Sequence, residues 1–463
     1  MILRDVEVDG RPGQDVVVEG DRIVAVGPGL VATHPGHDAL DGHGGALLPG
    51  LHDHHLHLRS MAARARSVAC GPPEVTGPEE LAAALASATA DRPADAWIRG
   101  VGYDERVVGV LDRAHLDALV PDHPARVQHR SGHLWVVNSP GLARLADVPD
   151  AARFDGHLYD ADDRFRGLDE HDPDEERAAL AAIGRRLASF GVTGVTDATT
   201  DNDEHAARWF AERRADGTVP FAVHLLGGDD LADGPRKVIL AEHDLPALDD
   251  LTATVAGAHR AGRPVAVHAA SRATVVLALA ALDAAGVIAG DRIEHASVAP
   301  PDLVEWMARQ GVTVVTQPGF VVAHGDRYLE EVDPDDQPWL YRGRGFVDAG
   351  VRLAAGSDAP FGPEDPWVAM QAAVDRRTAA GGVVGRGEAL TPEEALALHT
   401  GPADDPGGPP RRIAPGERAD LCLLSVPWVG ARRRLTADCV AATFVAGALV
   451  AEGGATRTPR STP

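Results

Sequence analysis

The chain has 463 residues, of which 44% are hydrophobic, and it carries a formal net charge of −25. This length exceeds one simple domain and fits a barrel of about 250 residues with additions. The acidic balance and the lack of a basic stripe argue against a nucleic-acid partner, and no apolar run reaches the roughly 20 residues that a membrane span needs. Three cysteines indicate neither a disulfide framework nor a cysteine metal site, and the charged N-terminal residues are not typical of a signal peptide. We therefore expect a cytoplasmic protein without a membrane partner.

Both ends of the chain alternate apolar and polar residues as short antiparallel strands do. The pattern runs through residues 15–27 near the N-terminus and through 419–426 and 439–453 near the C-terminus. Two strand-rich pieces at opposite ends predict one small β-sandwich domain, formed by residues 1–48 and 405–463. A linker rich in glycine and proline is expected near 400–416, and a loose tail in the last ten residues.

The middle of the chain alternates apolar, strand-like runs with helical runs rich in alanine and leucine. The predicted strands lie within 191–198, 264–270, 311–318 and 351–360, and the predicted helices are 173–190, 272–285 and 301–310. Short buried strands that alternate with helices are typical of parallel βαβ units. Over about 350 residues they predict an α/β fold, a (β/α)8 TIM-type barrel spanning 49–404. Within it, Thr391, Pro392 and Glu394 form the start signal of a further helix, a capping box.

One compositional feature concerns chemistry. Lys237 is the single lysine, beside 43 arginines among the 44 basic residues. Arginine stays protonated, whereas a buried lysine can lose its proton and act as a neutral amine. Lys237 is therefore either retained for its amine or a surface lysine that has survived by chance.

Residues 47–58, LLPGLHDHHLHL, contain the strongest local pattern. Alternate side chains of a strand share a face, so His55 and His57 lie on one face and His52 and His54 on the other. Two histidines at i and i+2 on an inward-facing strand can bind one metal ion through their ring nitrogens. The apolar residues before the pattern favour a buried strand over an accidental histidine cluster on a surface loop. His52 and His54 are expected to pack or to support the ligands.

Three further candidates end predicted strands, where a barrel carries its active site. His268 ends PVAVH, His295 follows RIE, and Asp358 ends VRLAAGSD. Each alone is unremarkable, because the polar end of a strand often holds a histidine or an aspartate. Together they are specific, because each ends a separate strand and all follow the histidine pair in chain order.

These segments resemble the amidohydrolase superfamily, and in particular its branch of metal-dependent hydrolases similar to N-substituted formamide deformylase. The resemblance covers nearly the whole chain, in the family's motif order. It rests on PGLHDHHLH, SGHLWVVNSPGL, GPRKVIL, VAVHAA, RIEHAS and GSDAPFGPEDP in the barrel, and on VEGDRIVAVG and IAPGERADLCLL in the predicted sandwich.

For the site, the resemblance implies two metal ions, which we expect to be zinc. His55 and His57 would bind the first, buried ion, and His268 and His295 would bind the second. Lys237 would be carbamylated by CO2 and would bridge the two ions. Carbamylation turns an amine into an anionic bridge with two oxygens, which an arginine cannot form.

For the reaction, the resemblance implies hydrolysis of a non-peptide C–N bond in a small-molecule amide, formamide or cyclic amide. The attacking group would be metal-activated hydroxide. Asp358 would contact the first metal ion and act as general base and then general acid. His133 would polarise the substrate carbonyl or hydrogen-bond to it, or it would only fix the loop 131–142. A homodimer is a further expectation from the family.

Three departures from the family's motifs concern the substrate. The Asp-Gly after the lysine is Ala241-Glu242 here, the Gly-Asp after the fifth-strand histidine is Ser271-Arg272, and the Asp of "DGH" is Ser131. None removes a metal ligand, and all lie where substrate-facing loops are expected. They therefore put the substrate in doubt more than the chemistry.

The loop expected at 319–345 carries four aromatic side chains, which either shape an apolar substrate site or simply pack the loop: Phe320, Tyr328, Trp339 and Tyr341.

Two other functions remain open at this stage. A mononuclear zinc deaminase would act on a heterocyclic or amidine-like substrate, and Lys237 would not be a ligand. A metal-free binding scaffold on the same fold would be expected to have lost several of the six ligand residues, all of which are metal-competent here.

Overall fold

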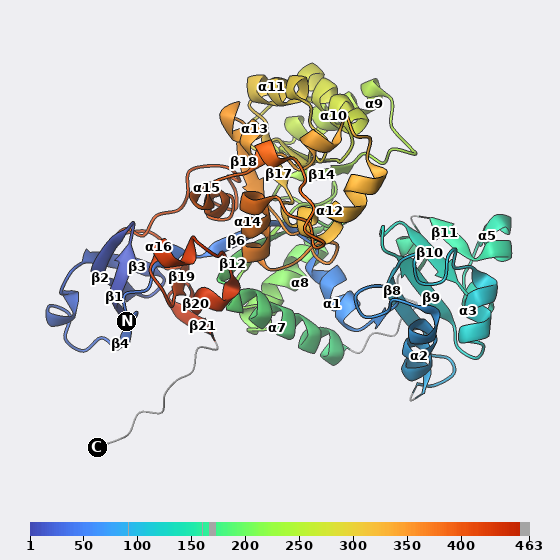
Figure 1. Cartoon of the computed structure of the whole chain (residues 1–463), viewed down its shortest axis with the longest axis horizontal. Coiled ribbons are helices and arrows are strands. Elements are labelled where there is room, and N and C mark those ends of the chain that lie inside the picture. Colours follow the sequence, from blue (N-terminus) through green and yellow to red (C-terminus); the bar gives the residue numbers. More distant parts are fainter. Residues whose placement is uncertain (91, 160, 166–172, 454–463) are drawn as a thin grey trace. The chain divides into compact units, whose positions relative to one another are not determined.

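The chain forms a mixed α/β fold in two compact units (Figure 1). The computed structural model describes residues 1–90, 92–159, 161–165 and 173–453. Unit 1 comprises Met1–Leu58 and Ala181–Pro463, and unit 2 is Arg59–Leu180. The range 49–404 predicted for the barrel contains all of unit 2, which the sequence analysis did not separate. The loose tail predicted for the last ten residues lies outside the described residues.

Parallel strands form the central part of unit 1. They are β6 (Leu51–Leu56), β12 (Val192–Asp197), β13 (Ala222–Leu225), β14 (Arg236–Ile239), β15 (Val265–Ala269), β16 (Arg292–His295), β17 (Thr313–Thr316) and β18 (Arg352–Ala355). Their order is β13-β12-β6 in one sheet and β14-β15-β16-β17-β18 in the other. Every residue of β12, β16 and β17 is buried, as expected for parallel strands covered on both faces. The strands predicted within 191–198, 264–270, 311–318 and 351–360 are confirmed.

Hydrogen bonds link the two parallel sheets at both of their edges. Between β13 and β14, the N–H of Lys237 donates to the carbonyl of Gly227 over 2.9 Å. Between β6 and β18, the N–H of Asp358 donates to the carbonyl of His55 over 2.7 Å. A Cβ atom on Gly356 would lie 2.5 Å from the backbone nitrogen of His55. Only glycine therefore allows the end of β18 to approach β6 so closely.

Helices follow the strands, as in βαβ units (Figure 1). Those of the barrel range in unit 1 are α7 (Pro173–Ser189, which begins in unit 2), α8 (Glu204–Ala215), α9 (Leu248–Arg260), α10 (Arg272–Ala285), α11 (Pro301–Gln310), α12 (Gly319–Glu331), α13 (Arg344–Asp348), α14 (Pro366–Asp375) and α15 (Pro392–Ala397). The helices predicted at 173–190, 272–285 and 301–310 are confirmed, as is the capping box of Thr391 and Glu394 that starts α15. In the described part of the chain, no helix has the length and apolar character to cross a membrane.

Two antiparallel-rich sheets join the ends of the chain within unit 1. Their strands are β1 (Ile2–Val8), β2 (Arg11–Glu19), β3 (Arg22–Gly27) and β4 (Ala39–Asp41) in the first, and β5 (Leu47–Pro49), β19 (Leu421–Leu424), β20 (Val440–Val445) and β21 (Ala448–Glu452) in the second. Leu3 and Val16 of the first sheet and Leu421 and Phe444 of the second belong to one buried cluster. Segments from opposite ends of the sequence therefore share a core.

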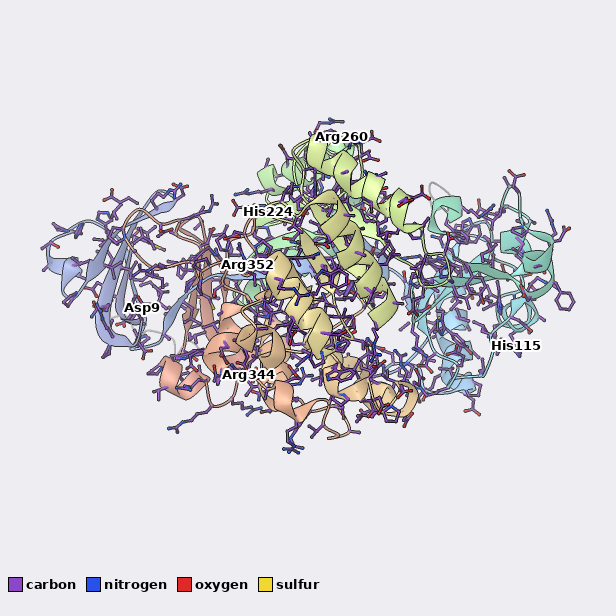
Figure 2. The ribbon with its side chains drawn as sticks, turned by 90° about the horizontal axis from the view of Figure 1, so that it is seen from above. Asp9, His115, His224, Arg260, Arg344 and Arg352 are labelled. Carbon is purple, nitrogen blue, oxygen red and sulfur yellow. The ribbon has the colours of Figure 1, made fainter. Side chains whose placement is uncertain are left out.

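The segment 400–416 contains neither helix nor strand, as predicted for a linker. It is nevertheless attached to the strands. Arg352, labelled in Figure 2, lies at the start of β18 and forms an ion pair with Asp405. Arg411 donates a side-chain hydrogen bond to the carbonyl of Gly50, directly before β6.

Unit 2 contains a sheet of its own with the order β11-β10-β9-β8-β7. Its elements are α1 (Leu58–Ala65, which begins in unit 1), β7 (Val68–Ala69), α2 (Pro78–Thr89), β8 (Ile98–Tyr103), α3 (Arg113–Leu119), β9 (Ala125–His129), β10 (Leu134–Val137), α4 (Ser139–Leu142), α5 (Asp150–Asp155), β11 (His157–Tyr159) and α6 (Asp162–Phe165). A buried cluster of its own includes Leu85, Ile98 and Val127. Unit 2 thus has an independent core.

The buried Arg376, at the end of α14, generates a stability prediction. The residue is 1% exposed, and its guanidinium donates to the carbonyls of Leu340, Tyr341 and Val384 over 2.7, 2.8 and 3.0 Å. Arg376→Met keeps an apolar stem but leaves three buried carbonyls without donors, so the free energy of unfolding should fall by about 3 kcal/mol. Urea denaturation measures this change. The exposed Arg377→Met is the control and should change stability by less than about 0.5 kcal/mol; equal losses in the two variants would contradict the assignment.

Candidate metal centre

The histidine pair of the HxH pattern lies at the C-terminal end of β6. His55 is 1% exposed, and the side chain of His57 is 19% exposed. Both rings turn Nε2 toward the same carboxylate oxygen of Asp358, at 3.5 Å from His55 and 3.2 Å from His57. The structure therefore brings the two histidines and the proposed proton-transfer residue together.

The charge of Asp358 is stabilised by these histidines. Burial raises the pKa of this carboxyl group, but the hydrogen bond with His57 and the electrostatic interactions with His55 and His295 outweigh burial. The pKa of Asp358 consequently lies below its ordinary value, and the group is ionised at neutral pH. An ionised carboxylate can accept a proton or bind a cation.

His268 and His295 end the neighbouring strands β15 and β16. Nε2 of His295 lies 2.9 Å from Nδ1 of His268. His55, His295 and Asp358 each offer one ligand atom, and these atoms all lie within 4.8 Å of one another. Two imidazoles and a carboxylate at this spacing are a suitable set of ligands for zinc and related ions.

Lys237 lies on β14 and is 5% exposed. Its Nζ is buried and has no hydrogen-bond partner among the described residues. Burial lowers the pKa of Lys237 to about 8. Burial is the main cause that lowers the pKa of His55, His268 and His295, and the positive charge of Lys237 lowers each of them further. The amine therefore lies near all three rings. A buried amine without a partner costs free energy, so its position calls for an interaction that the polypeptide alone does not supply.

Hydrogen bonds behind the histidines fix their rings, and the sequence analysis missed the groups that make them. Nδ1 of His55 hydrogen-bonds to the carboxylate of Glu294. Nδ1 of His295 lies 2.7 Å from Oε1 of Gln317, and Nδ1 of His57 lies 3.2 Å from the hydroxyl of Thr199. Glu294 was visible in the RIEH segment as the residue before His295, but nothing local indicated that it would contact β6.

Two of the candidate ligands have unusual backbone conformations. His295 has φ 73° and Asp358 has φ 52°, both in the left-handed region that side chains with a Cβ seldom adopt. Such conformations cost on the order of 1 kcal/mol or more and concentrate at functional sites. These backbone conformations change the direction of the chain at His295, the last residue of β16, and at Asp358, just after β18.

The three residues of β6 that precede His55 make structural contacts. His52 hydrogen-bonds to Thr196 over 2.9 Å, and the ring of His54 is buried, with its centroid 4.5 Å from that of His52. Asp53 accepts the backbone N–H groups of His55 and Ser357, each over 3.0 Å. Burial raises the pKa of Asp53 to about 6, although these hydrogen bonds lower it. Asp53 therefore ties β6 to the segment that carries Asp358.

His133 belongs to unit 2 and is exposed. Its backbone N–H donates to the hydroxyl of Ser131 over 3.4 Å. His133 and the six candidate ligands belong to different units, and the role of His133 in catalysis stays a prediction.

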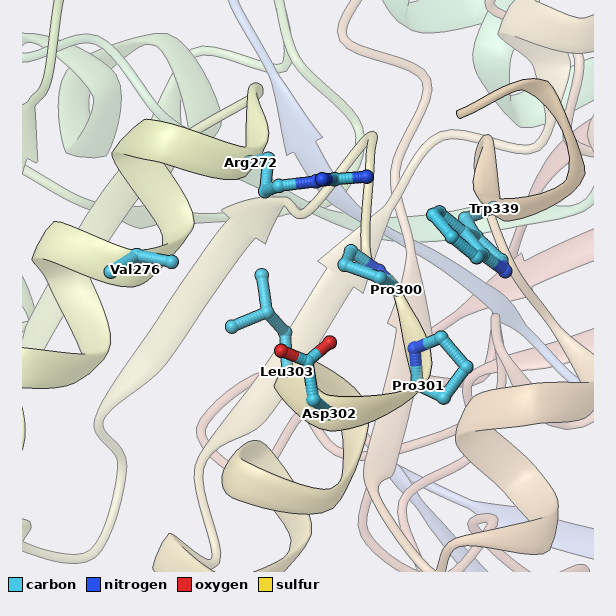
Figure 3. Close-up of a pocket in the computed structure, with 7 residues that line it drawn as sticks. All are labelled: Arg272, Val276, Pro300, Pro301, Asp302, Leu303 and Trp339. Atoms are coloured by element: carbon cyan, nitrogen blue, oxygen red, sulfur yellow. The ribbon is translucent and has the colours of Figure 1, made fainter. Parts of the chain in front are cut away.

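Arg272, which stands where the family motif has an aspartate, lines a cavity of about 370 Å³ (Figure 3). Arg272 on the first turn of α10 and Asp302 on the first turn of α11 lie on different sides of it, and the indole of Trp339 lies at one end. The guanidinium lies 5.4 Å from the Trp339 ring centroid and forms an ion pair with Asp336. Ser271, the other substituted residue, caps α10 through the N–H of Thr274. Ser271-Arg272, in place of the family's Gly-Asp, therefore still caps α10 and places a positively charged side chain in the cavity.

The segment 319–345 is largely helical, so the prediction of a loop there was wrong. Glycines and β-branched residues disfavour a helix locally, but α12 packs its apolar face in a buried cluster that includes Phe320 and Tyr341. These two residues are 8% and 5% exposed, as expected for packing. Tyr328 hydrogen-bonds to the Tyr341 hydroxyl over 3.2 Å, whereas Trp339 lines the cavity.

Comparison with known proteins identifies the family. The model of the amidohydrolase family matches residues 38–451. N-substituted formamide deformylase of Arthrobacter pascens is 25% identical, over 91% of this chain and 92% of its own length. An uncharacterized metal-dependent hydrolase of Pyrococcus horikoshii OT3 has a similar fold, with a TM-score of 0.73 and 20% identity over 92% of this chain and 97% of its own. Atrazine chlorohydrolase TrzN of Arthrobacter aurescens TC1, crystallised with zinc, has a TM-score of 0.55 and 16% identity over 98% and 95% of the two chains.

The family model spans most of the chain, including every residue of the candidate centre. The chain belongs to the amidohydrolase family and is a hydrolase of carbon–nitrogen bonds.

Proposed function

We propose that the protein is a metal-dependent amidohydrolase that cleaves a non-peptide C–N bond in a small molecule. The observation that carries this proposal is the convergence of His55, His295 and Asp358, with ligand atoms within 4.8 Å of one another, beside the buried, unpartnered amine of Lys237. The substrate classes considered are amides, formamides and cyclic amides. The name of the Arthrobacter pascens relative favours formamides among them.

The proposed architecture is a closed (β/α)8 barrel with a β-sandwich formed by both ends of the chain. The hydrogen bonds from Lys237 to Gly227 and from Asp358 to His55 link the two parallel sheets at both edges, which supports closure. The buried cluster shared by Leu3 and Phe444 supports the sandwich. The domain ranges 1–48, 49–404 and 405–463, the homodimer and the cytoplasmic location remain predictions.

Two zinc ions fit the residues present. His55, His57 and Asp358 would hold one ion, and His268 and His295 would hold the other. Imidazole and carboxylate ligands suit zinc, and manganese, iron or cobalt could also occupy such a set. The zinc in the structure of the chlorohydrolase relative is consistent with this choice.

Lys237 fits the role of a carbamylated bridge between the ions. CO2 reacts with a neutral amine, and with a pKa of about 8 roughly one Lys237 side chain in ten is neutral at pH 7. At the ordinary lysine pKa the fraction would be about one in three thousand. The carbamate would provide anionic oxygens where the structure has an unpartnered Nζ.

The chain's residues would then perform acid–base chemistry at one carboxylate. When bound, zinc supplies Lewis-acid polarisation of a carbonyl and lowers the pKa of water. Asp358 accepts the proton of the attacking water, and the new C–O bond forms at the carbonyl carbon. Asp358 returns this proton to the leaving nitrogen as the C–N bond breaks, so amide and water become a carboxylic acid and an amine. Nε2 of His57 lies 3.2 Å from Asp358, so these two residues can hold the same ion.

Metal analysis is the first test. Purified protein should contain about two zinc ions per chain, and removal by a chelator should abolish hydrolysis and lower the melting temperature. Zinc at about a thousand times its Kd should restore roughly 4 kcal/mol of stability. One tightly bound ion would favour the mononuclear deaminase, and a protein that neither contains zinc nor is stabilised by it would favour the metal-free scaffold.

Lys237→Ala tests the bridge. Loss of the carbamate should reduce kcat/KM by roughly a hundredfold or more, and acetate or another short carboxylic acid should restore part of the activity by occupying the vacated space. Lys237→Arg is the control, because it keeps a positive charge but cannot form a carbamate; it should be inactive and not rescued. An active Lys237→Ala enzyme would remove lysine from the mechanism.

A hydrolysis screen tests the bond. N-formyl, N-acyl and cyclic amide compounds should include substrates that release amine and carboxylic acid in equal amounts. Asp358→Asn should lower kcat by about 10²–10⁴-fold on any such substrate, because the general base and acid is lost. Release of ammonia from heterocycles alone would instead identify a deaminase.

A further inference from the structure

In three candidate ligands, the ring nitrogen Nδ1 contacts a group of a different chemical type in each case. Nδ1 of His55 faces a carboxylate, Glu294; Nδ1 of His295 faces an amide oxygen, Gln317; and Nδ1 of His57 faces a hydroxyl, Thr199. The amide orientation of Gln317 is fixed by its own Nε2, which donates to the carbonyl of Val315 over 3.3 Å. Among these three partners only Glu294 can carry a full negative charge.

Glu294 can act only as an acceptor where it lies. It is 0% exposed, and each oxygen has its own donor: Nε of Arg292 faces Oε1, and Nδ1 of His55 faces Oε2. Arg292 is 1% exposed, donates also to the carbonyl of His54 over 3.1 Å, and cannot accept a hydrogen bond. The ion pair with the buried Arg292 thus keeps the buried carboxylate charged. Because a charged carboxylate accepts at both oxygens, Nδ1 of His55 must carry the proton.

We propose that Glu294 is a positioning residue that fixes the His55 tautomer and makes the two metal sites unequal in affinity. A proton on Nδ1 leaves the lone pair of Nε2 facing Asp358, where the proposed function places the first metal ion. A carboxylate behind an imidazole also raises its basicity as a ligand. His295 has only a neutral amide behind it. The ion at His55, His57 and Asp358 is therefore held more tightly than the ion at His268 and His295.

The inference rests on the proposed function for its metal ions, but the tautomer can be measured without them. Glu294→Gln has the same shape with one acceptor atom. Arg292 has only donors, so the Gln oxygen turns to Arg292 and the amide NH2 turns to His55. Nδ1 of His55 must then accept, and its proton moves to Nε2, the nitrogen that faces the proposed metal ion.

Zinc titration with a competing chelator tests the affinities. The wild-type chain should bind zinc in two steps, and Glu294→Gln should weaken the tighter step by about 10–100-fold. Gln317→Leu is the matched variant on the other side: it removes the acceptor for His295 and should weaken only the weaker step. Thr199→Val removes the neutral partner of His57 and should weaken the tighter step less than Glu294→Gln does.

Ring ¹⁵N spectra of the metal-free chain test the tautomer, with the His55 signals assigned by their loss in His55→Asn. Nδ1 should be protonated in the wild type and Nε2 in Glu294→Gln. Should Glu294→Gln fail to fold, Glu294→Asp keeps both acceptor oxygens and should retain the Nδ1 proton with an intermediate affinity. A folded Glu294→Gln with the wild-type tautomer and zinc affinity would overturn the inference and leave the proposed function intact. A wild-type chain that binds no zinc would instead overturn the proposed function, while the ¹⁵N result would still decide the tautomer.

Discussion

The close approach of β18 to β6 is the contact on which the candidate centre depends. The N–H of Asp358 donates to the carbonyl of His55, and Asp53 accepts the backbone N–H groups of His55 and Ser357. Gly356 permits the contact, because any larger residue would meet the backbone of His55. A histidine and a carboxylate 303 positions apart in the sequence (358 minus 55) are thereby held within reach of a single ion. The PGLHDHHLH and GSD segments are therefore held together by hydrogen bonds between the ends of β6 and β18.

The parts of the fold that the sequence predicted are those encoded by local periodicity. The helices α7, α10 and α11 were predictable because their apolar spacing and end residues are local. The helix α12 was not, because only packing of Phe320 and its neighbours in a tertiary cluster compensates for the poor helix propensity of its residues. The separate core of unit 2 was missed for a similar reason, since nothing local distinguishes its strands from those of the barrel range.

The candidate centre divides in the same way. His55 and His57 could be identified from alternation along one strand, and the resemblance to the amidohydrolase family supplied the order of the remaining ligands. The groups behind them could not be identified, because Glu294, Gln317 and Thr199 reach the histidines through hydrogen bonds across 239, 22 and 142 positions of sequence. Periodicity contains no information on such pairs. They follow from the parallel register, which sets β16 beside β15 and β17 and brings its end toward β6.

The charged groups of the candidate centre constrain one another because they are buried. Burial raises the free energy of every charged form, so Asp358 and Glu294 remain ionised only because cationic and hydrogen-bonding partners lie beside them. Changing one member leaves an unpaired charge or an unsatisfied donor, which constrains all of them together. Arg272 is under no such constraint, because its side chain is 49% exposed and its ion pair with Asp336 lies at the surface. Exposed residues at the helix starts, such as Arg272, can therefore be exchanged at little cost in stability, whereas the buried residues of the candidate centre cannot.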